Sequence, residues 1–486
     1  MAAGGAWAWY ASQDLVLSHY DAKAHLVVAR RVLDSLTPGW KQLGAVWLPL
    51  PHLVNLLPVQ VDLLYRTGAF ASLVSIACFG LTVWAAARLT IALTGSWIGA
   101  VTCAGLLVLN PNVLYLHVTP MTEPMAMAAA FLVVLWLYEW LSAGELRSPR
   151  ARLGLAMFAA VWTRYEAWLV VAAGITAAIY VLARRGAGWR RIGRAAAALA
   201  AWPVAAVLLF VIYSRLSTGV WFVTGGFYEV DPYYHGHPWR SLRAVWWGTH
   251  RLSGYVIATV AMSTAGLLAY RAVRQRPVFL VPLALFAAAA LPFYAFAEGH
   301  PFRIRYMVPV VAACALLGGV AVGAARGARF AGALAALLIG SSVVESPPWN
   351  TRAPMLVEAQ LDVPRSLQRR QVTACLADRY RGERVFASMA SLAHYMHELS
   401  HEGFDIADFV HEGNGTLWLE GLQKGAAAQA GWLLIEEQSE GGDVLSRRAV
   451  ADPGFAQGMT RVCDGGGVAL YQRDSAEPAL RTSGRP

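Results

Sequence analysis

A candidate reactive group lies close to the start of the chain, in the stretch HYDAKAH at residues 19–25. From Asp21 the sequence follows a helical pattern, with one apolar stripe made of Ala22, Leu26, Ala29, Leu33 and Leu36. Asp21 would open this helix, where the helix dipole keeps a carboxylate ionised and able to accept a proton, and His25 follows one turn later. The alternative is that Asp21 only caps an amphipathic helix lying on a membrane surface near residues 21–36.

A second carboxylate, Glu123, stands in the stretch TPMTEP at the start of an apolar run. The charge pattern described below places Glu123 on the same side of the membrane as Asp21. The two carboxylates together predict a site at the edge of a helix bundle. Capping of the helix that follows is the alternative role for Glu123.

Three cationic side chains are predicted on that same side. Arg303 and Arg305 lie in the stretch EGHPFRIRYMVP, together with His300 and Tyr306, where an apolar run begins. Arginines there run against the charge bias of the chain and indicate an anionic partner such as a lipid phosphate. Snorkelling of long side chains to the membrane surface is the alternative. Lys41, in the stretch GWKQLGAVW, is a further cation that could bind phosphate as a point charge.

The stretch WTRYEAW carries a pair of opposite charges, Arg164 and Glu166. Both flanks of residues 151–183 are basic, yet this stretch is too short for two crossings of about 20 residues each. A short hairpin is expected, with its tip at membrane depth. A lipid-facing charge there would cost at least about 2.5–3.5 kcal/mol, so the two side chains should face protein or a wet cavity. They form either a structural ion pair or part of a substrate site.

These groups belong to a chain whose composition is that of a membrane protein. Of its 486 residues, 57% are hydrophobic and 14% are charged. Most apolar runs reach the roughly 20 residues that a helix needs to cross a bilayer. They lie near residues 66–87, 96–116, 123–143, 153–163, 165–183, 195–214, 252–270, 278–296, 306–323 and 328–344. Residues 1–10 make half a span without the features of a signal peptide, so a truncated or misassigned start and a total of about eleven helices are expected.

The net charge of +10 comes mainly from short arginine clusters between apolar runs. This is the positive-inside pattern, which argues against nucleic acid as the partner. It places in the cytoplasm the connections at residues 88, 147–152, 184–194, 271–276 and 326–329. The segments that carry the candidate residues, and the tail after residue 344, are then extracytoplasmic. The preference for arginine over lysine, with many Ala and Gly, indicates a bacterium and hence its cytoplasmic membrane.

The chain changes character at residue 344, so a membrane domain of residues 1–344 precedes a polar domain of residues 345–486. Short β-like runs at 384–388, 431–437 and 467–473 alternate with helical segments and predict a small α/β domain. A disulfide is possible there between Cys375 and Cys463. A helical repeat of histidines could bind a metal or form a solvated polar face; it consists of His394, His397 and His401.

Together these residues resemble the glycosyltransferase-C superfamily, in the branch of protein O-mannosyltransferases, aminoarabinose transferases and rhizobial galacturonosyltransferases. The resemblance covers the layout of residues 10–345. Asp21 matches the aspartate of the first external loop and Glu123 the acidic residue of the second, while TRYEAW and RIRYMVP look like family patterns. Ala22 departs from the pattern, because many members have a second acid there, and this leaves the role of a divalent metal open.

The resemblance implies a mainly α, polytopic fold and transfer of a sugar from a polyprenyl-phosphate donor to a lipid, glycan or protein acceptor outside the cytoplasmic membrane. Asp21 would be the base, with inversion at the anomeric carbon, and Glu123 would orient the acceptor or the sugar. The leaving phosphate would be stabilised by Lys41, Arg303 and Arg305. The alternative is a transporter or flippase of a lipid-linked or anionic substrate, which predicts inverted repeats that the sequence does not show.

Overall fold

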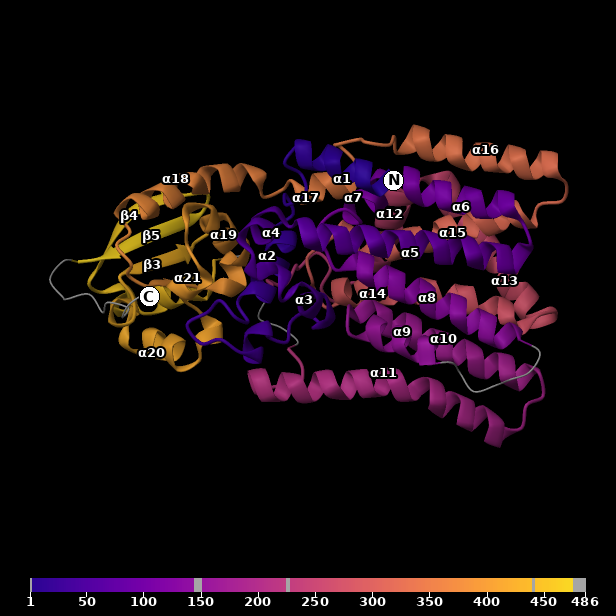
Figure 1. Ribbon diagram of the computed structural model, residues 1–486, viewed down its shortest axis with the longest axis horizontal. Coiled ribbons are helices and arrows are strands. Elements are labelled where there is room, and N and C mark those ends of the chain that lie inside the picture. Colours follow the sequence, from indigo (N-terminus) through magenta and orange to yellow (C-terminus); the bar gives the residue numbers. More distant parts are fainter. Residues whose placement is uncertain (1, 144–150, 224–227, 439–441, 475–486) are drawn as a thin grey trace.

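The computed structural model describes residues 2–143, 151–223, 228–438 and 442–474. A long helix bundle forms one end of the molecule and a small α/β domain forms the other, with short helices from the N-terminal part between them (Figure 1). The predicted mainly α membrane fold with a small C-terminal α/β domain is confirmed.

The bundle contains the helices that were predicted from the apolar runs. Among the described residues, eight are long and apolar enough to cross a membrane. They are α5 (Ala69–Thr94), α8 (Glu123–Ser142), α10 (Tyr165–Arg184), α11 (Trp189–Thr218), α13 (Tyr255–Arg274), η3 with α14 (Pro277–Ala297), η4 with α15 (Ile304–Ala324) and α16 (Ala328–Glu345). Shorter bundle helices are α1 (Ala2–Ser12), α6 (Trp97–Leu109), α7 (Pro111–Leu116), α9 (Ala151–Val161) and α12 (Pro238–Ser253). The total of eleven spans stays a prediction.

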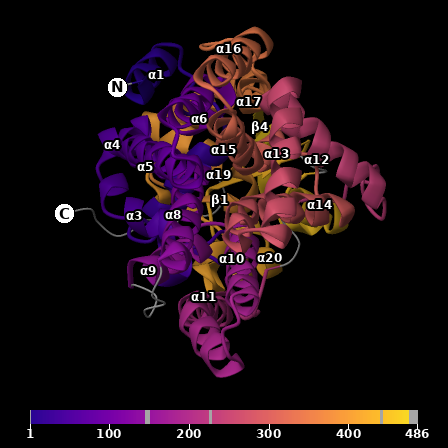
Figure 2. The ribbon, with the colours of Figure 1, turned by 90° about the vertical axis from the view of Figure 1, so that its right-hand side faces the viewer.

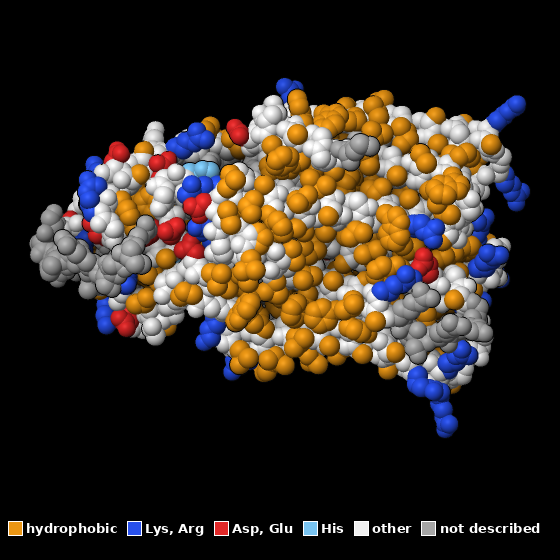
Figure 3. Space-filling view, in the orientation of Figure 1, with side chains coloured by type: hydrophobic (Ala, Val, Ile, Leu, Met, Phe, Trp, Pro, Cys, Tyr) orange, Lys and Arg blue, Asp and Glu red, His pale blue; other side chains and the backbone are white. Residues whose placement is uncertain are grey.

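Hydrophobic side chains cover the visible face of the bundle, and Lys and Arg side chains gather at its end far from the α/β domain (Figure 3). At that end Arg88 and Arg152 both approach Glu139, at 3.9 and 2.8 Å, and Arg184 donates to the backbone of α13 at 2.8 Å. Residues 147–150 of the predicted basic connection lie outside the described residues. Basic connections that are distant in sequence therefore meet at one end of the bundle.

The span formed by η4 and α15 is the most buried of the eight and lies near the middle of the bundle in the end-on view (Figure 2). Glycines let α15 approach α6 closely, because a Cβ on Gly319 would lie 2.5 Å from the Cβ of Cys103. A Cβ on Gly99 would lie 2.5 Å from the carbonyl oxygen of Gly319. Small residues permit such close helix contacts in membranes. The second half of α15 is thereby held close against α6 in the interior of the bundle.

Short helices near the N-terminus fill the space between the two domains (Figure 1). They are α2 (Tyr20–Arg30), η1 (Trp40–Leu43), α3 (Leu50–Asn55), η2 (Pro58–Gln60) and α4 (Asp62–Thr67). α2 is shorter than the helix predicted near residues 21–36, because the chain turns after Arg30. Its side chains are mostly buried against α3 and against α19 (Met389–Leu399). Of the apolar stripe that suggested a membrane-surface helix, Ala22, Leu26 and Ala29 therefore pack against protein, whereas Leu33 lies beyond the helix and is 51% exposed.

Polar contacts hold α2 and the following turn to the α/β domain. Nζ of Lys23 is 2.6 Å from Oε1 of Glu398 on α19. The carboxylate of Asp34 accepts the backbone N–H groups of residues 406–407 at 3.2 and 3.0 Å. Because these partners come from segments more than 370 residues apart in sequence, the N-terminal helices and the C-terminal domain form one packed unit.

The α/β domain contains a five-stranded sheet in the order β2-β1-β3-β5-β4. The strands are β1 (Val385–Ala387), β2 (Phe409–Val410), β3 (Trp432–Glu436), β4 (Met459–Gly465) and β5 (Val468–Arg473). β1 is parallel to β2 and β3, and β5 is antiparallel to β3 and β4. The three predicted runs are confirmed as β1, β3 and β5. The helices of this domain are α17 (Pro354–Ala359), α18 (Val363–Arg379), α19, α20 (Thr416–Lys424) and α21 (Val444–Ala451).

The possible disulfide is confirmed: Cys375 on α18 is bonded to Cys463 on β4, across a sequence separation of 88 residues. Closing so long a loop restricts the unfolded chain, and removing such a bond typically costs about 2–5 kcal/mol. We expect the Cys375→Ser, Cys463→Ser double variant to unfold at a lower temperature than the wild type. The measurement is thermal unfolding in detergent with and without reductant. The reductant should lower the midpoint of the wild type and leave that of the variant unchanged.

Candidate active site

The guanidinium of Arg305 is the centre of a buried ion cluster at the end of the bundle next to the α/β domain. Nη2 of Arg305 pairs with Oδ2 of Asp21, and Nε lies 3.4 Å from Oε1 of Glu123. Nη1 lies 2.5 Å from Nε2 of His19. Arg305 is 5% exposed and Glu123 is 1% exposed. Two predicted carboxylates and one predicted arginine, from three distant segments, are thus in direct contact.

Local signals in the sequence explain how the two carboxylates reach this place. Asp21 lies in the first turn of α2, and the ring of His19, the N-cap residue, accepts the N–H of Asp21 at 3.1 Å. Glu123 is the first residue of α8 and is followed by Pro124, a residue favoured at a helix start. Carboxylates in the first turn are stabilised by the helix dipole. The two helices therefore present their N-terminal ends, each with an acid, to the same arginine.

A second arginine extends the cluster. Nη1 of Arg164, the N-cap residue of α10, lies 2.9 Å from Oε1 of Glu123 and donates to Oγ1 of Thr122 at 2.9 Å. Nη2 of Arg164 lies 2.6 Å from Oε1 of Glu166. The predicted pair of Arg164 and Glu166 is present, and it is joined to Glu123. Acidic and basic groups thus alternate through the buried cluster.

The charge on Arg305 controls the protonation of Asp21. Burial by itself would raise the pKa of the Asp21 carboxyl, but the charge of the neighbouring Arg305, with a smaller effect of Arg303, holds this pKa well below its usual range. Asp21 is therefore ionised, and it is a weak base as long as Arg305 remains paired with it. If the guanidinium of Arg305 left Asp21 and paired with another anion, the pKa of Asp21 would rise and Asp21 would become a stronger base.

His25 lies one turn beyond Asp21 and is neutral. Its Nδ1 is 3.1 Å from Nε2 of His52, and its ring contacts Trp47 with the ring centroids 4.3 Å apart. Burial, followed by the neighbouring His52, lowers the pKa of His25 well below its usual value. His25 thus lines the site without adding charge.

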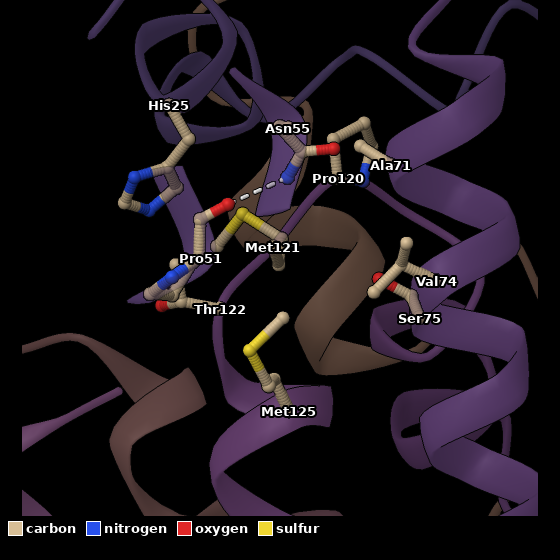
Figure 4. Close-up of a pocket in the computed structure, with 10 residues that line it drawn as sticks. All are labelled: His25, Pro51, Asn55, Ala71, Val74, Ser75, Pro120, Met121, Thr122 and Met125. Carbon is tan, nitrogen blue, oxygen red and sulfur yellow. Dashed lines mark hydrogen bonds between the residues drawn. The ribbon is translucent and has the colours of Figure 1, made fainter. Parts of the chain in front are cut away.

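A small pocket lies beside the cluster (Figure 4). Its polar side chains are those of His25, Asn55, Ser75 and Thr122, and the remaining lining residues are apolar. Thr122 also accepts the hydrogen bond from Arg164, so the pocket borders the buried ions. Its wall on α5 is formed by Ala71, Val74 and Ser75, and Thr122 lies on the side that borders the ions.

Tyr306 lies next to both arginines, with its ring centroid 5.3 Å from the guanidinium carbon of Arg305 and 5.8 Å from that of Arg164. Its hydroxyl is 3.4 Å from Nε2 of His300. Arg303 adds, through its charge, to the lowering of the pKa of Asp21. Two further predicted residues, Tyr306 and His300, thus lie beside the ion pairs.

Lys41 differs from the other predicted residues. It lies exposed on η1, and within the described part of the chain no hydrogen bond or ion pair joins it to the cluster. Two residues of the cluster were not predicted. His19 could have been found from its position as the N-cap residue before Asp21. Glu358 on α17, whose Oε1 lies 3.8 Å from Nε2 of His19, carries no local signal.

The histidines of the α/β domain do not form the predicted solvated face. His394 and His397 are buried against the N-terminal helices. Nε2 of His394 lies 3.6 Å from Oδ2 of Asp362, and Nε2 of His397 lies 2.9 Å from the carbonyl oxygen of Tyr65. Among the residues that the structure describes, no group of three metal-binding side chains is found.

Arg164 is expected to be important for stability. Arg164→Met would leave the charges of Glu123 and Glu166 buried with fewer partners, and breaking a buried ion pair in this way costs about 3–5 kcal/mol. Thermal unfolding in detergent would measure the change. Glu166→Gln should cost less, because Arg164 keeps Glu123 as its partner. Equal losses in the two variants would contradict the role given to Glu123.

The fold, a bundle of apolar helices with a small α/β domain at one end, is shared with solved structures. The particular solved structures that it resembles are those of ArnT from Cupriavidus metallidurans. The structure of ArnT bound to undecaprenyl phosphate is 14% identical, with a TM-score of 0.58, and the match covers 96% of each chain. The apo structure is 12% identical, with a TM-score of 0.57 over 97% of this chain and 98% of that one.

Comparisons by sequence gave no such match. No protein-family profile and no curated protein matches the chain.

Proposed function

We propose that the protein is an integral membrane glycosyltransferase that moves a sugar from a polyprenyl-phosphate donor to an acceptor hydroxyl. The observation that carries this proposal is the buried contact between Asp21 and Arg305 in a chain with this fold. The contact joins an acid that can accept a proton to a cation that can bind a phosphate. The solved ArnT structure with undecaprenyl phosphate supports a lipid of the same chemical class as the donor's carrier.

In the proposed reaction Asp21 accepts the proton of the acceptor hydroxyl while that oxygen attacks the anomeric carbon of the sugar. The bond between this carbon and the phosphate oxygen breaks, and the polyprenyl phosphate leaves with the bonding electrons. A single displacement of this kind inverts the anomeric centre. Arg305, with Arg303, neutralises the charge on the departing phosphate, and Lys41 is a further candidate for the phosphate at the exposed edge.

Because Arg305 pairs with Asp21, donor binding should precede the activation of Asp21 as a base. Before the donor binds, Arg305 holds Asp21 as a weak base. A donor phosphate competes for the same guanidinium, and a shift of Arg305 toward it raises the pKa of Asp21. The base is then strengthened when the donor is in place. Glu123, held by Arg164, remains to orient the sugar or the acceptor.

We place the cluster and the α/β domain on the extracytoplasmic side. The basic connections lie at the opposite end of the bundle, in agreement with the positive-inside rule. The disulfide between Cys375 and Cys463 is of a kind that persists in oxidising compartments. Reporter fusions after residues 190 and 345 test this orientation, and a cytoplasmic reporter at residue 345 would contradict it.

The experiment that tests the function starts from the purified protein in nanodiscs. Mass spectrometry of the co-purified lipids should detect a polyprenyl phosphate or its glycosylated form. Incubation with undecaprenyl-phosphate sugars and candidate acceptors should then release undecaprenyl phosphate. Movement of an intact lipid-linked sugar across the bilayer without cleavage would instead support the transporter or flippase.

A further inference from the structure

A histidine and a glutamate that have no role in the proposed reaction lie beside Asp21. Nδ1 of His19 accepts the backbone N–H of Asp21 at 3.1 Å. Nε2 of the same ring is 2.5 Å from Nη1 of Arg305 and 3.8 Å from Oε1 of Glu358. His19 is 1% exposed, and Oε1 of Glu358 is buried without a hydrogen-bond partner. A buried carboxylate oxygen therefore faces the imidazole that caps the proposed base.

The two contacts of the His19 ring with N–H donors exclude one another in the neutral ring. Neutral imidazole has one N–H and one acceptor nitrogen. When Nδ1 accepts the N–H of Asp21, the ring proton is on Nε2, where it is attracted by the carboxylate of Glu358, 3.8 Å away, but opposes the N–H of Arg305. When Nε2 accepts from Arg305, the proton is on Nδ1 and the cap on Asp21 is lost. The partner of Nε2 therefore decides whether Asp21 is capped.

Glu358 lies where its carboxylate can stabilise the His19 tautomer that has its proton on Nε2. Its Oε2 accepts the backbone N–H of Ile304 in η4 at 2.5 Å. The helix that carries it, α17, is anchored to the bundle because the N–H of Met355 donates to Oδ1 of Asn112 at 3.0 Å. Met355 and Leu356 are fully buried. The second oxygen of Glu358 is thus presented to His19 from a fixed position.

We infer that Glu358 and His19 are a positioning pair for Asp21: the carboxylate of Glu358 holds His19 in the tautomer whose Nδ1 caps the base. The inference rests on the proposed function, in which the donor phosphate draws Arg305 away from Asp21. Asp21 then loses its ion-pair partner, and the Nε2–H group of His19 is no longer opposed by the N–H of Arg305. The His19 cap then keeps the carboxylate aimed at the acceptor.

Three substitutions separate this role from simple packing. Glu358→Gln can still accept from Ile304 through its oxygen, but it presents an NH₂ group to His19 and favours the wrong tautomer. His19→Asn places an acceptor where Nδ1 was and should keep the cap, since Asn is a good N-cap residue. His19→Gln places its polar group at the position of Nε2 and loses the cap. Glu420→Gln, on α20, is the control for the loss of a carboxylate away from the cluster, because the Glu420 side chain is half-exposed and pairs with Lys424.

For sugar transfer, Glu358→Gln and His19→Gln should lower kcat by up to about 100-fold, as expected for a misplaced reacting group, with little change in KM for the donor. His19→Asn should retain most of kcat. In the His19→Asn background, Glu358→Gln should have little further effect, because no tautomer is left to select. An equal loss in that background, or a change in KM alone, would overturn the inference. Absence of transfer by the wild type would instead refute the proposed function.

Hydrogen exchange without substrate gives a readout that does not depend on activity. Peptides covering residues 19–25 should exchange faster in Glu358→Gln and His19→Gln than in the wild type, and His19→Asn should resemble the wild type. Equal exchange in all four proteins would show that the cap does not depend on Glu358, and the inference would fail.

Discussion

Asp21→Asn is expected to lower kcat for sugar transfer by about 10²- to 10⁴-fold, the usual contribution of a general base. The substitution keeps the size of the side chain and removes its ability to accept the proton. It also releases Arg305 from its main ion pair. Binding of undecaprenyl phosphate should therefore be at least as tight as in the wild type, which titration of the purified protein in nanodiscs would measure.

The control for this prediction is Asp14→Asn. Asp14 is exposed and has a positive φ of 55°, a conformation that Asn adopts readily. It should leave both turnover and lipid binding unchanged. Near-native turnover in Asp21→Asn would refute Asp21 as the base, and weaker lipid binding would indicate that Asp21 takes part in binding the donor.

Arg305→Met is expected to weaken binding of undecaprenyl phosphate about 10- to 100-fold, because a charge-assisted hydrogen bond contributes about 1.5–3 kcal/mol. Burial alone would raise the pKa of Asp21, and the charge of Arg305 contributes most to lowering it. This pKa should therefore rise in the variant. A base must be ionised to act, and the residual kcat/KM should therefore decline at a higher pH on the acid side than in the wild type. Lipid titration and a pH profile of kcat/KM measure the two effects.

Arg274→Met is the control for the Arg305 variant, because Arg274 is exposed at the opposite, basic end of the bundle. It should alter neither lipid affinity nor the pH profile. Arg305→Lys keeps the charge but loses the planar guanidinium that contacts Asp21, Glu123 and His19 together, so it should recover only part of the affinity. Full binding by Arg305→Met would leave Arg305 as a purely structural partner of Asp21.

The sequence predicted those parts of the site that depend on local signals. Asp21 and Glu123 open helices at the positions expected from their neighbours, and the charge pattern placed both at the same end of the bundle. The fold class followed from the apolar runs in the same way. Each of these inferences needs only a short segment and its flanks.

The parts that sequence could not predict depend on packing between distant segments. The direct pairing of Arg305 with Asp21 joins residues 284 positions apart, and nothing near Arg305 in the sequence indicates its partner. The apolar stripe of α2 suits a lipid surface as well as a protein surface, so only the structure reveals that α19 covers it. Glu358 comes from beyond the last span and reaches the site through tertiary contacts alone.

The contact between α2 and the α/β domain limits how this protein can be divided or recombined. The helix that carries Asp21 touches α19 through Lys23 and Glu398, and the turn after it binds the backbone at residues 406–407. A C-terminal domain taken from a relative would have to match this surface, or it would displace the reactive carboxylate. Exchange of whole domains should therefore succeed only when residues 19–44 are exchanged with them, and during evolution the two segments should change together.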